Sequence, residues 1–239
     1  MGLDMYLEKR TDVRQWNFKK EDEQFEVIVK KGGVTYPKIN PKNIIGCVVY
    51  PATYTESPGV IRHVEGNRFP LGELDGSVTE RIKLISQMMT DAGFKSPILE
   101  DIRAEIWLKL WGNMTFNPIS ALTHEHLEGI CRYPLTNDLA RCMMGEAQTI
   151  AEKLGVVFRV DIERRIAGAE KVGQHKTSML QDLEAGNSLE IDALLGSVIE
   201  LGKITDTVTP CLSTVFALTK LLNTKVQSSQ GKLSLATVA

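Results

Sequence analysis

The chain has 239 residues, a formal net charge of -2 at pH 7 and an ordinary share of charged residues, 24%. A chain of this length can bury a substantial core, either as one large domain or as two small ones. The near-neutral charge balance argues against a general nucleic-acid-binding protein, and so does the lack of a Lys/Arg block with interleaved aromatic residues.

No stretch of about 18 apolar residues occurs, so no membrane-spanning segment is predicted. The N-terminal sequence MGLDMYLEKRTD contains acidic residues early and no apolar signal core. The four cysteines are scattered, without a CxxC motif or a histidine at ligand spacing: Cys47, Cys131, Cys142 and Cys211. We therefore expect reduced, mostly buried thiols in a cytoplasmic protein, and no structural zinc site.

Residues 1–43 form a highly charged leader with nine basic and seven acidic residues. Within it the sequences FEVIV, KKGG and VTYPKI predict a short β-hairpin with a glycine-containing loop. The leader is too small to have a core of its own. We expect its hairpin to add strands to the exposed edge of the sheet that follows.

Strands are predicted over residues 44–75. The run IIGCVVY at 44–50 is apolar and rich in β-branched residues, which is typical of a buried strand. Two further strands, at 59–66 and 68–73, are joined by turns. These segments predict a small, mostly antiparallel sheet.

The next region predicts an all-helical domain over residues 76–226, followed by a frayed tail at 227–239. Pro118 is expected to end the second helix, because proline cannot donate the helical hydrogen bond. The expected helices begin or end at local capping signals: one after the capping box of Ser77 and Glu80, then 99–116, 136–154, 161–184, 188–201 and a last helix starting at Thr209 and Pro210. The predicted fold class is therefore α+β.

Phosphate-binding glycine motifs are absent from the sequence. Neither G-x-G-x-x-G nor G-x-x-x-x-G-K-[ST] occurs. Gly32 and Gly33 come nearest, but they lie in the expected hairpin loop and not between a strand and a helix. The residues present predict no backbone site for a pyrophosphate.

An apolar helix carries three polar residues at four-residue steps in the sequence KLWGNMTFN, namely Lys109, Asn113 and Asn117. Each step advances about 400°, so the three side chains share one face. A lysine and two amides in a cleft could bind an oxyanion or a carbonyl oxygen, and a buried lysine could act as a general acid. The alternative is a solvated face with an ion pair between Glu105 and Lys109.

A second polar stretch is HKTSMLQDLEAGNSLEID at residues 175–192. Each of its candidate residues has a structural explanation. His175 fits a surface or capping histidine, Ser178 fits a helix surface position, and Glu190 fits a capping box with Asn187.

Two further groups of residues are interpreted as structural. His124 and His126 resemble half of a metal site only loosely, since no third ligand at suitable spacing accompanies them. Trp107 and Trp111 are expected in the core or at an interface. The methionines are more typical of a core than of a cofactor site: Met88, Met89, Met143 and Met144.

Taken together, these stretches resemble the ketopantoate reductase (2-dehydropantoate 2-reductase) family over residues 44–225. The resemblance rests on IRAEIWLKLWGNMTFNPISALT, on HKTSMLQDLEAGNSLEID, and on GSVIELGK followed by TP. It implies a helical domain like the C-terminal domain of 6-phosphogluconate dehydrogenase, and residues 44–75 look like the end of the nucleotide-binding domain. In this family an N-terminal Rossmann domain binds NADPH, and a hydride reduces ketopantoate to pantoate.

The resemblance also implies roles for individual residues. Lys109 matches the catalytic lysine that protonates the new alkoxide. Asn113 and Asn117 match amides that line the substrate site, and Ser178 matches a hydroxyl that holds the substrate. Glu190 matches the acid that binds the substrate's hydroxyl and orients the site.

The sequence departs from the family pattern in its first part, where residues 1–43 do not resemble a Rossmann domain. We therefore expect the substrate-binding and catalytic part of a reductase, which is inactive alone and holds neither NADPH nor a metal. The alternative is a non-catalytic helical protein that dimerises or binds a partner, since family members often pair through this domain. A third hypothesis is an assembly or regulatory protein whose charged leader recognises a partner.

Overall fold

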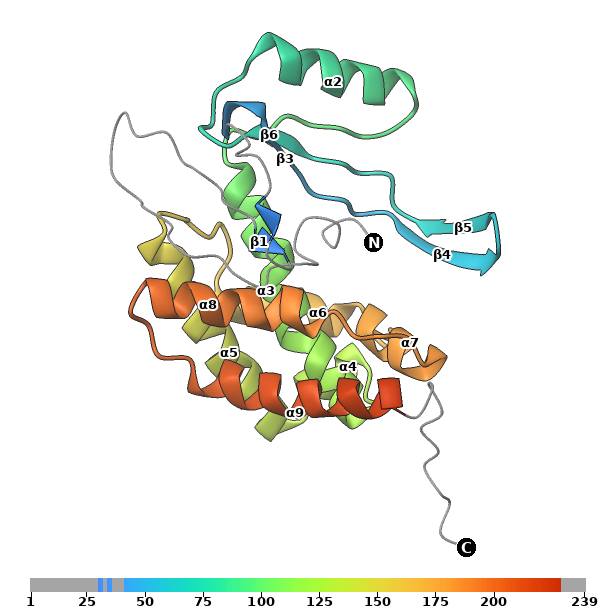
Figure 1. Ribbon diagram of the computed structural model, residues 1–239, viewed down its shortest axis with the longest axis vertical. Helices are drawn as coiled ribbons and strands as arrows, with labels where there is room; N and C mark the ends of the chain where they lie inside the picture. Colours follow the sequence, from blue (N-terminus) through green and yellow to red (C-terminus); the bar gives the residue numbers. More distant parts are fainter. Residues whose placement is uncertain (1–29, 32–33, 36–40, 229–239) are drawn as a thin grey trace, which may run out of the picture. The chain divides into compact units, whose positions relative to one another are not determined.

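The computed structural model describes residues 30–31, 34–35 and 41–228 (Figure 1). The described residues fall into two compact units, divided between Ile106 and Trp107. The first unit contains the strands and the second is helical, which confirms the predicted α+β class with a small antiparallel sheet and a helical domain.

The strands of the first unit pair in three antiparallel couples. Their bounds are β1 (Lys30–Lys31), β2 (Val34–Thr35), β3 (Ile45–Cys47), β4 (Ala52–Ser57), β5 (Val60–Glu65) and β6 (Leu71–Glu73), with a short 3-10 helix at Pro41–Asn43. Strand β3 pairs with β6, and the bonds from Val48 N to Pro70 O and from Tyr50 N to Arg68 O continue this pairing. The predicted strand at 44–50 is thus confirmed at Ile45–Cys47, and the two further bonds extend the pairing to Tyr50.

The described part of the predicted hairpin is present, because β1 pairs antiparallel with β2. These four residues do not pair with β3 or β6, and most of the rest of the leader, on which the expected extension of the sheet depends, lies outside the described residues. Strand β4 was not predicted, because ATYTES is largely polar and exposed. Pairing with β5 along its length stabilises β4 as a strand. The pattern of apolar and polar residues in the sequence does not reveal this pairing.

Close packing in the first unit depends on Gly72 in β6. A Cβ at this position would lie 2.5 Å from both Leu99 O and Ile102 Cβ. Leu99 N in turn donates to Leu71 O over 2.7 Å. The absent side chain therefore lets the first turn of α3 lie directly against the strand.

Helix α2 (Glu80–Asp91) begins later than predicted. Its N-cap is Thr79, whose side chain accepts from Ile82 N, whereas the Ser77 hydroxyl donates to Asp75 Oδ1. The expected capping box at Ser77 is therefore wrong by two residues. The residue that can reach the helical amides is the one immediately before the first turn.

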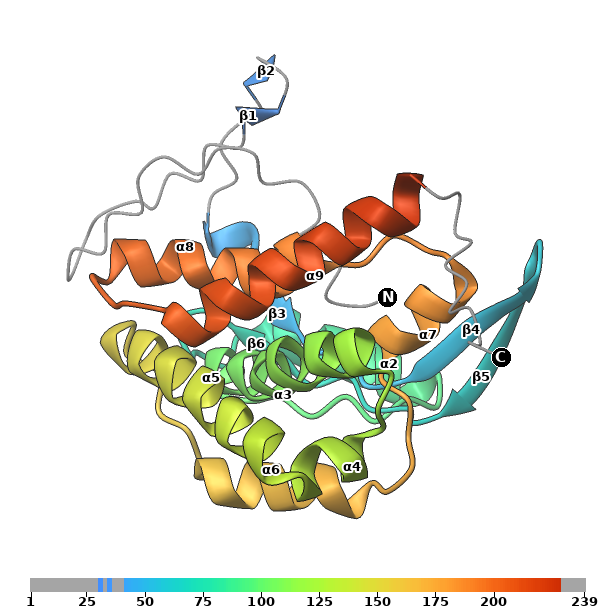
Figure 2. The same ribbon diagram turned by 90° about the horizontal axis from the view of Figure 1, so that it is seen from below.

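The second unit is built from helices packed around α5. The remaining helices are α3 (Ile102–Thr123), which starts in the first unit, α4 (Leu127–Arg132), α5 (Pro134–Lys153), α6 (Ile162–Lys171), α7 (Ser178–Ala185), a π-helical turn η2 (Asp192–Gly196), α8 (Ser197–Ile204) and α9 (Pro210–Ser228). Helix α5 contacts α4, α6, α8 and α9 (Figure 2). No described helix is both long and apolar enough to cross a membrane.

Three helix boundaries differ from the expectations. Pro118 lies inside α3, which continues to Thr123, because the residues around it are buried and their packing offsets the missing hydrogen bond. The predicted helix at 161–184 is two helices, since Gly173 adopts φ +78° after α6. The predicted helix at 188–201 is the turn η2 followed by α8. Helix α4 was not predicted.

The core of the second unit contains most of the aromatic and methionine residues that were expected there. Trp111, Met143 and Met144 are completely buried, and Trp111 Nε1 donates to Met144 O over 2.9 Å. Met88 and Met89 are the exceptions, because they lie on α2 in the first unit, where Met88 is 62% exposed and Met89 is half-buried. Among these residues, Trp111 and the α5 methionines belong to the core and offer no surface to a partner.

The cysteines differ from the prediction of four reduced thiols. Cys142 of α5 and Cys211 of α9 form a disulfide across 69 residues. Cys131 is a buried thiol, and burial raises its pKa to about 11. The spacing of cysteines along the sequence does not predict such a pair, because it does not show which helices pack together.

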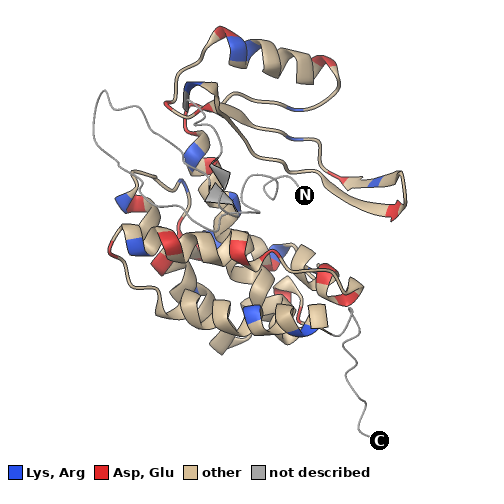
Figure 3. Cartoon of the chain, viewed as in Figure 1, with Lys and Arg blue, Asp and Glu red and all other residues tan. Residues whose placement is uncertain are grey.

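Charged side chains of both signs are interspersed along the helices (Figure 3). One pair connects α5 to α6, where Arg141 donates to both carboxylate oxygens of Glu163 at 2.7 and 2.9 Å. These hydrogen bonds lower the pKa of Glu163 below its usual value. The pair is exposed and contributes little to stability.

Candidate functional site

Helix α3 carries the three polar residues that the sequence singled out. Lys109 and Asn113 are half-buried, and Asn117 is only 7% exposed. They follow one another over about 12 Å of helix, at a rise of about 1.5 Å per residue. Burial of an amide on a helix whose other faces form the core requires hydrogen-bond partners.

Asn117 meets Ser178, the serine of the second polar stretch. Asn117 Nδ2 donates to Ser178 Oγ over 3.3 Å, which joins α3 to α7 across 61 residues. Ser178 is exposed, and its hydroxyl keeps a proton that it can donate to another group. The structure therefore brings two of the predicted substrate residues together.

The position of Ser178 is set by the start of α7. Thr177, buried at 5% exposure, is the N-cap and accepts from Leu180 N over 3.2 Å. His175 is exposed, which agrees with a surface histidine and not with a capping one, since the cap is Thr177. Because the cap is buried and bonded, the first residue of α7 has a fixed place beside α3.

Glu190 lies half-buried between α7 and the turn η2. The capping box predicted for it does not form, because the next helix begins only after Ile191 and the Asn187 side chain donates to Asp182 Oδ1. The backbone of Glu190 accepts from Leu194 N over 3.1 Å. A π-helical turn directly after it is a feature that occurs often at functional sites.

A residue that the sequence reading missed holds this segment. Asn223 of α9 is 6% exposed, and its Oδ1 accepts from Leu189 N over 2.8 Å. Its Nδ2 lies 3.5 Å from Leu189 O. The buried amide thus pairs with both backbone groups of the residue before Glu190. An isolated asparagine near the end of a helix provides no sequence signal for this role.

In the first unit, Glu105 forms a cluster that was also not predicted. Its Oε1 accepts from Tyr50 OH over 2.8 Å and from Arg68 Nη1 over 2.7 Å. Burial, and then the hydrogen bond to Glu105, raises the pKa of Tyr50 to about 12. Arg68 also lies over the Tyr50 ring, with 5.2 Å from Cζ to the ring centroid. The start of α3 is therefore fixed to the ends of the paired strands.

Histidines 124 and 126 do not form a metal centre with a third described ligand. His126 Nδ1 lies 3.6 Å from Glu125 Oε1. Within the part of the chain that the structure describes, the one group of three candidate ligand atoms is Cys142, Glu146 and Cys211.

The first unit contains part of the arrangement that a dinucleotide site requires. Segment 95–98 runs parallel to β6 and is connected to it through α2, so the elements of a crossover are present. The turn before α2 has a single glycine, Gly76. The Glu73 carboxylate accepts from Thr79 Oγ1 and Arg81 at the start of α2, where a phosphate would bind. A buried carboxylate there disfavours a phosphate, and the described residues do not fit a pyrophosphate.

The chain matches a known protein family and several known proteins. The family described as "Ketopantoate reductase PanE/ApbA C terminal" matches residues 101–223, which include all of the predicted site residues. The 2-dehydropantoate 2-reductase of Mesorhizobium japonicum is 53% identical over 194 residues, 81% of this chain and 60% of that protein. The enzyme of the same name from Archaeoglobus fulgidus is 29% identical over 158 residues, 66% of this chain and 53% of that protein.

A solved structure agrees with these matches. The crystal structure of 2-dehydropantoate 2-reductase from Methylococcus capsulatus superposes with a TM-score of 0.69 at 31% identity, covering 80% of this chain and 65% of that chain. The chain thus spans about 60% of the length of such relatives. Because the family match covers more than half of its residues, this chain belongs to the ketopantoate reductase family.

Proposed function

We propose that the helical unit binds a 2-oxo acid and carries the proton-donating part of its reduction, as in the conversion of ketopantoate to pantoate. The observation that supports this most is the hydrogen bond of 3.3 Å between Asn117 and Ser178. It joins two residues that family resemblance assigns to the substrate and that lie 61 positions apart. Residues 76–226 would be the substrate domain and residues 44–75 the end of a nucleotide-binding domain.

The side chains suit the chemistry of a 2-oxo acid, whose carboxylate and carbonyl oxygens accept hydrogen bonds. The amides of Asn113 and Asn117 and the hydroxyl of Ser178 are donors for these oxygens. On reduction the carbonyl oxygen takes up a proton, and Lys109 is the residue that would donate it. Glu190 would accept a hydrogen bond from the substrate's hydroxyl.

This proposal does not include cofactor binding by the described residues. NADPH serves the family, but the described residues do not fit its pyrophosphate. We therefore infer that the part of the chain that the structure describes does not catalyse the reaction alone. The nucleotide would be held by another domain or another chain, in a cytoplasmic assembly.

The test measures substrate and cofactor binding separately with the purified chain. Calorimetry is expected to show saturable ketopantoate binding, and a fluorescence titration is expected to show no saturable NADPH binding up to about millimolar concentration, which corresponds to about -4 kcal/mol. Tight NADPH binding would overturn the inference on the cofactor. Absence of ketopantoate binding would overturn the proposed substrate site.

A second candidate function, a non-catalytic helical protein that dimerises, is favoured by one surface. Leu218 and Leu221 of α9 are 53% and 69% exposed and lie one turn apart. If this surface forms a homodimer, Leu221→Glu should convert the protein to a monomer in sedimentation, while ketopantoate binding is unchanged. A wild-type protein that sediments as a monomer at high concentration would contradict this candidate.

A further inference from the structure

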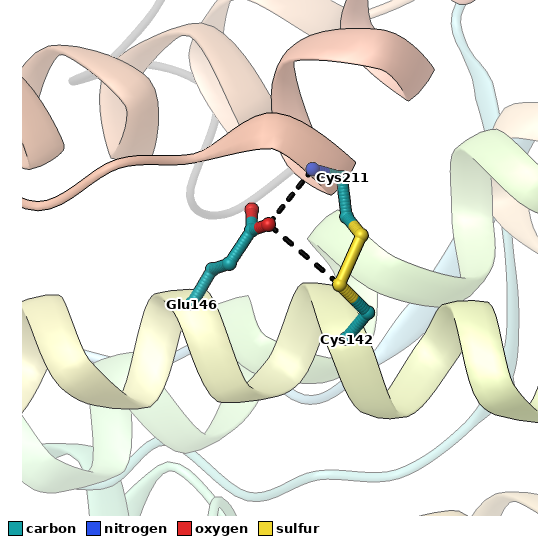
Figure 4. A group of neighbouring side chains, drawn as sticks. All are labelled: Cys142, Glu146 and Cys211. Carbon is teal, nitrogen blue, oxygen red and sulfur yellow. Dashed lines mark hydrogen bonds between the residues drawn. A yellow bond between two sulfur atoms is a disulfide. The ribbon is translucent and has the colours of Figure 1, made fainter.

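Two cysteines and a glutamate meet where α5 packs against the start of α9 (Figure 4). Cys142 and Glu146 are four residues apart on α5, so they share one face of the helix. Cys211 is the second residue of α9, and its Cα lies 6.3 Å from the Cα of Cys142. One sulfur from each cysteine and one carboxylate oxygen all lie within 4.8 Å of one another.

The glutamate is held in place independently of the sulfur atoms. Glu146 Oε1 accepts from Cys211 N over 2.7 Å, and Oε2 accepts from Leu212 N over 3.0 Å. These amides belong to the first turn of α9, whose partial positive charge favours a carboxylate. Each carboxylate oxygen has a second lone pair, so the oxygen that faces Cys142 can bind another group while the helix stays capped.

One distance in this cluster has the value expected between two ligand atoms of a metal centre. Glu146 Oε1 lies 3.7 Å from Cys142 Sγ, and this is a non-bonded contact because a disulfide sulfur carries no hydrogen. In a tetrahedral zinc site with Zn–S of about 2.3 Å and Zn–O of about 2.1 Å, neighbouring ligand atoms are roughly 3.6–3.8 Å apart. The glutamate oxygen already lies at that distance from one sulfur.

We propose that reduction of the Cys142–Cys211 disulfide converts this cluster into a binding site for a thiophilic divalent cation such as Zn²⁺. The two cysteine sulfurs and one oxygen of Glu146 would supply three ligands, and water would supply the fourth. None of the three side chains is buried, so a reductant and an ion can reach them. The site is distinct from the polar residues of α3 and α7 and does not depend on the proposed reductase function.

The chemistry balances with a dithiol as the reductant. The dithiol supplies two electrons and two protons, becomes a disulfide itself, and leaves Cys142 and Cys211 as thiols. Binding of the cation then releases both protons, because the thiolate is the metal ligand. Two thiolates beside a carboxylate repel one another without a cation, and a charge of +2 offsets most of that repulsion. Disulfide and metal are therefore mutually exclusive states of one site.

This scheme also connects the disulfide with the expected cytoplasmic environment. Disulfides are uncommon in reducing compartments, where the same cysteines would be thiols. The metal would then provide the connection between α5 and α9 that the disulfide provides under oxidising conditions.

The test uses the full chain, reduced with a trialkylphosphine that is then removed under anaerobic conditions. Titration with Co²⁺ should produce the absorption of a tetrahedral, sulfur-ligated ion at one equivalent, and Zn²⁺ should abolish this absorption by displacement. The untreated, disulfide-bonded protein should bind neither ion. A reduced protein that keeps its helical circular dichroism but binds no Co²⁺ would overturn the proposal.

Variants separate this site from other thiols and from loss of folding. Cys211→Ser should abolish the sulfur-to-cobalt absorption, and Glu146→Gln should weaken binding at least tenfold. Cys131→Ser, which changes a buried thiol outside the cluster, is the matched control and should bind one equivalent as the wild type does. Equal binding by Cys211→Ser and wild type would contradict the assigned ligands.

Discussion

Asn117 and Ser178 are hydrogen-bonded at 3.3 Å, and the bond connects the long helix α3 with the first residue of α7. The two residues differ in exposure, since Asn117 is buried and Ser178 is exposed. Ser178 is exposed although its oxygen accepts from a buried amide, so a small ligand in solvent can reach this residue. This arrangement is what makes the pair a candidate for substrate binding.

Replacing Asn117 should therefore weaken ketopantoate binding. Asn117→Ala removes the donor to Ser178 and one donor for the ligand, and we expect the affinity to fall about 3- to 10-fold, which corresponds to about 0.7–1.4 kcal/mol. Calorimetry measures the change. Asn187→Ala removes an exposed amide outside the pair and is the control. Equal affinities of the two variants would rule out a role for Asn117 in binding.

The acid stability of the first unit should depend on Glu73. This carboxylate is 4% exposed, and hydrogen bonds from Arg81 lower its pKa below the usual value of 4.5. The folded protein therefore binds this proton less tightly than the unfolded chain does. The resulting stability is fully present above a pH of about 5 and is lost as the pH falls through the lowered pKa.

The measurement is the melting temperature as a function of pH for wild type and Glu73→Gln. The variant has no carboxylate to protonate, so its melting temperature should fall less steeply between about pH 5 and pH 3. Lys83→Gln, which removes an exposed partner of Glu80, is the control and should follow the wild-type slope. Parallel curves for wild type and Glu73→Gln would show that the carboxylate contributes no pH dependence.

Two glycine substitutions should have opposite effects on stability. Gly72→Ala would place a Cβ 2.5 Å from the Leu99 carbonyl oxygen, so the strand and α3 would have to separate. We expect a loss of about 2 kcal/mol or more. The Cβ added by Gly168→Ala in α6 would have no atom within 4 Å. This substitution should stabilise the protein by up to about 1 kcal/mol, because alanine has a higher helix propensity than glycine. Denaturant unfolding compares the two, and a neutral Gly72→Ala would contradict the close approach.

Asn223 should contribute to stability far more than its neighbour on α9. Asn223→Ala leaves the buried Leu189 N–H without its acceptor, a loss of about 1–3 kcal/mol. Thr224→Ala removes an exposed hydroxyl that bonds only within its own helix, and we expect a change below about 0.5 kcal/mol. Hydrogen exchange at the Leu189 amide should accelerate only in Asn223→Ala. Unchanged exchange there would mean that the amide is protected by other contacts.

Much of the fold follows from local signals. The β-branched run at 44–50 forms strand β3 and its continuation, and Pro210 begins α9. The helix expected at 136–154 ends where predicted, and Gly155 with φ +81° follows it. Such features depend on a few neighbouring residues, whose backbone preferences and hydrogen bonds are the same in any context.

Other features were decided by packing and strand pairing that the local sequence pattern did not show. Pro118 remains helical because its surroundings are buried, and the polar segment of β4 is a strand because β5 pairs with it. The disulfide between Cys142 and Cys211 has no local signal at all.

The sequence by itself determined the α+β class, the helical domain and the residue types of the candidate site. Only the tertiary structure decided which of these residues meet: Asn117 with Ser178, Asn223 with Leu189, and Glu146 with Cys211. The physical reason is that helix packing brings together residues more than 30 positions apart. Their proximity depends on which apolar faces are buried against one another, and a local pattern does not specify that choice.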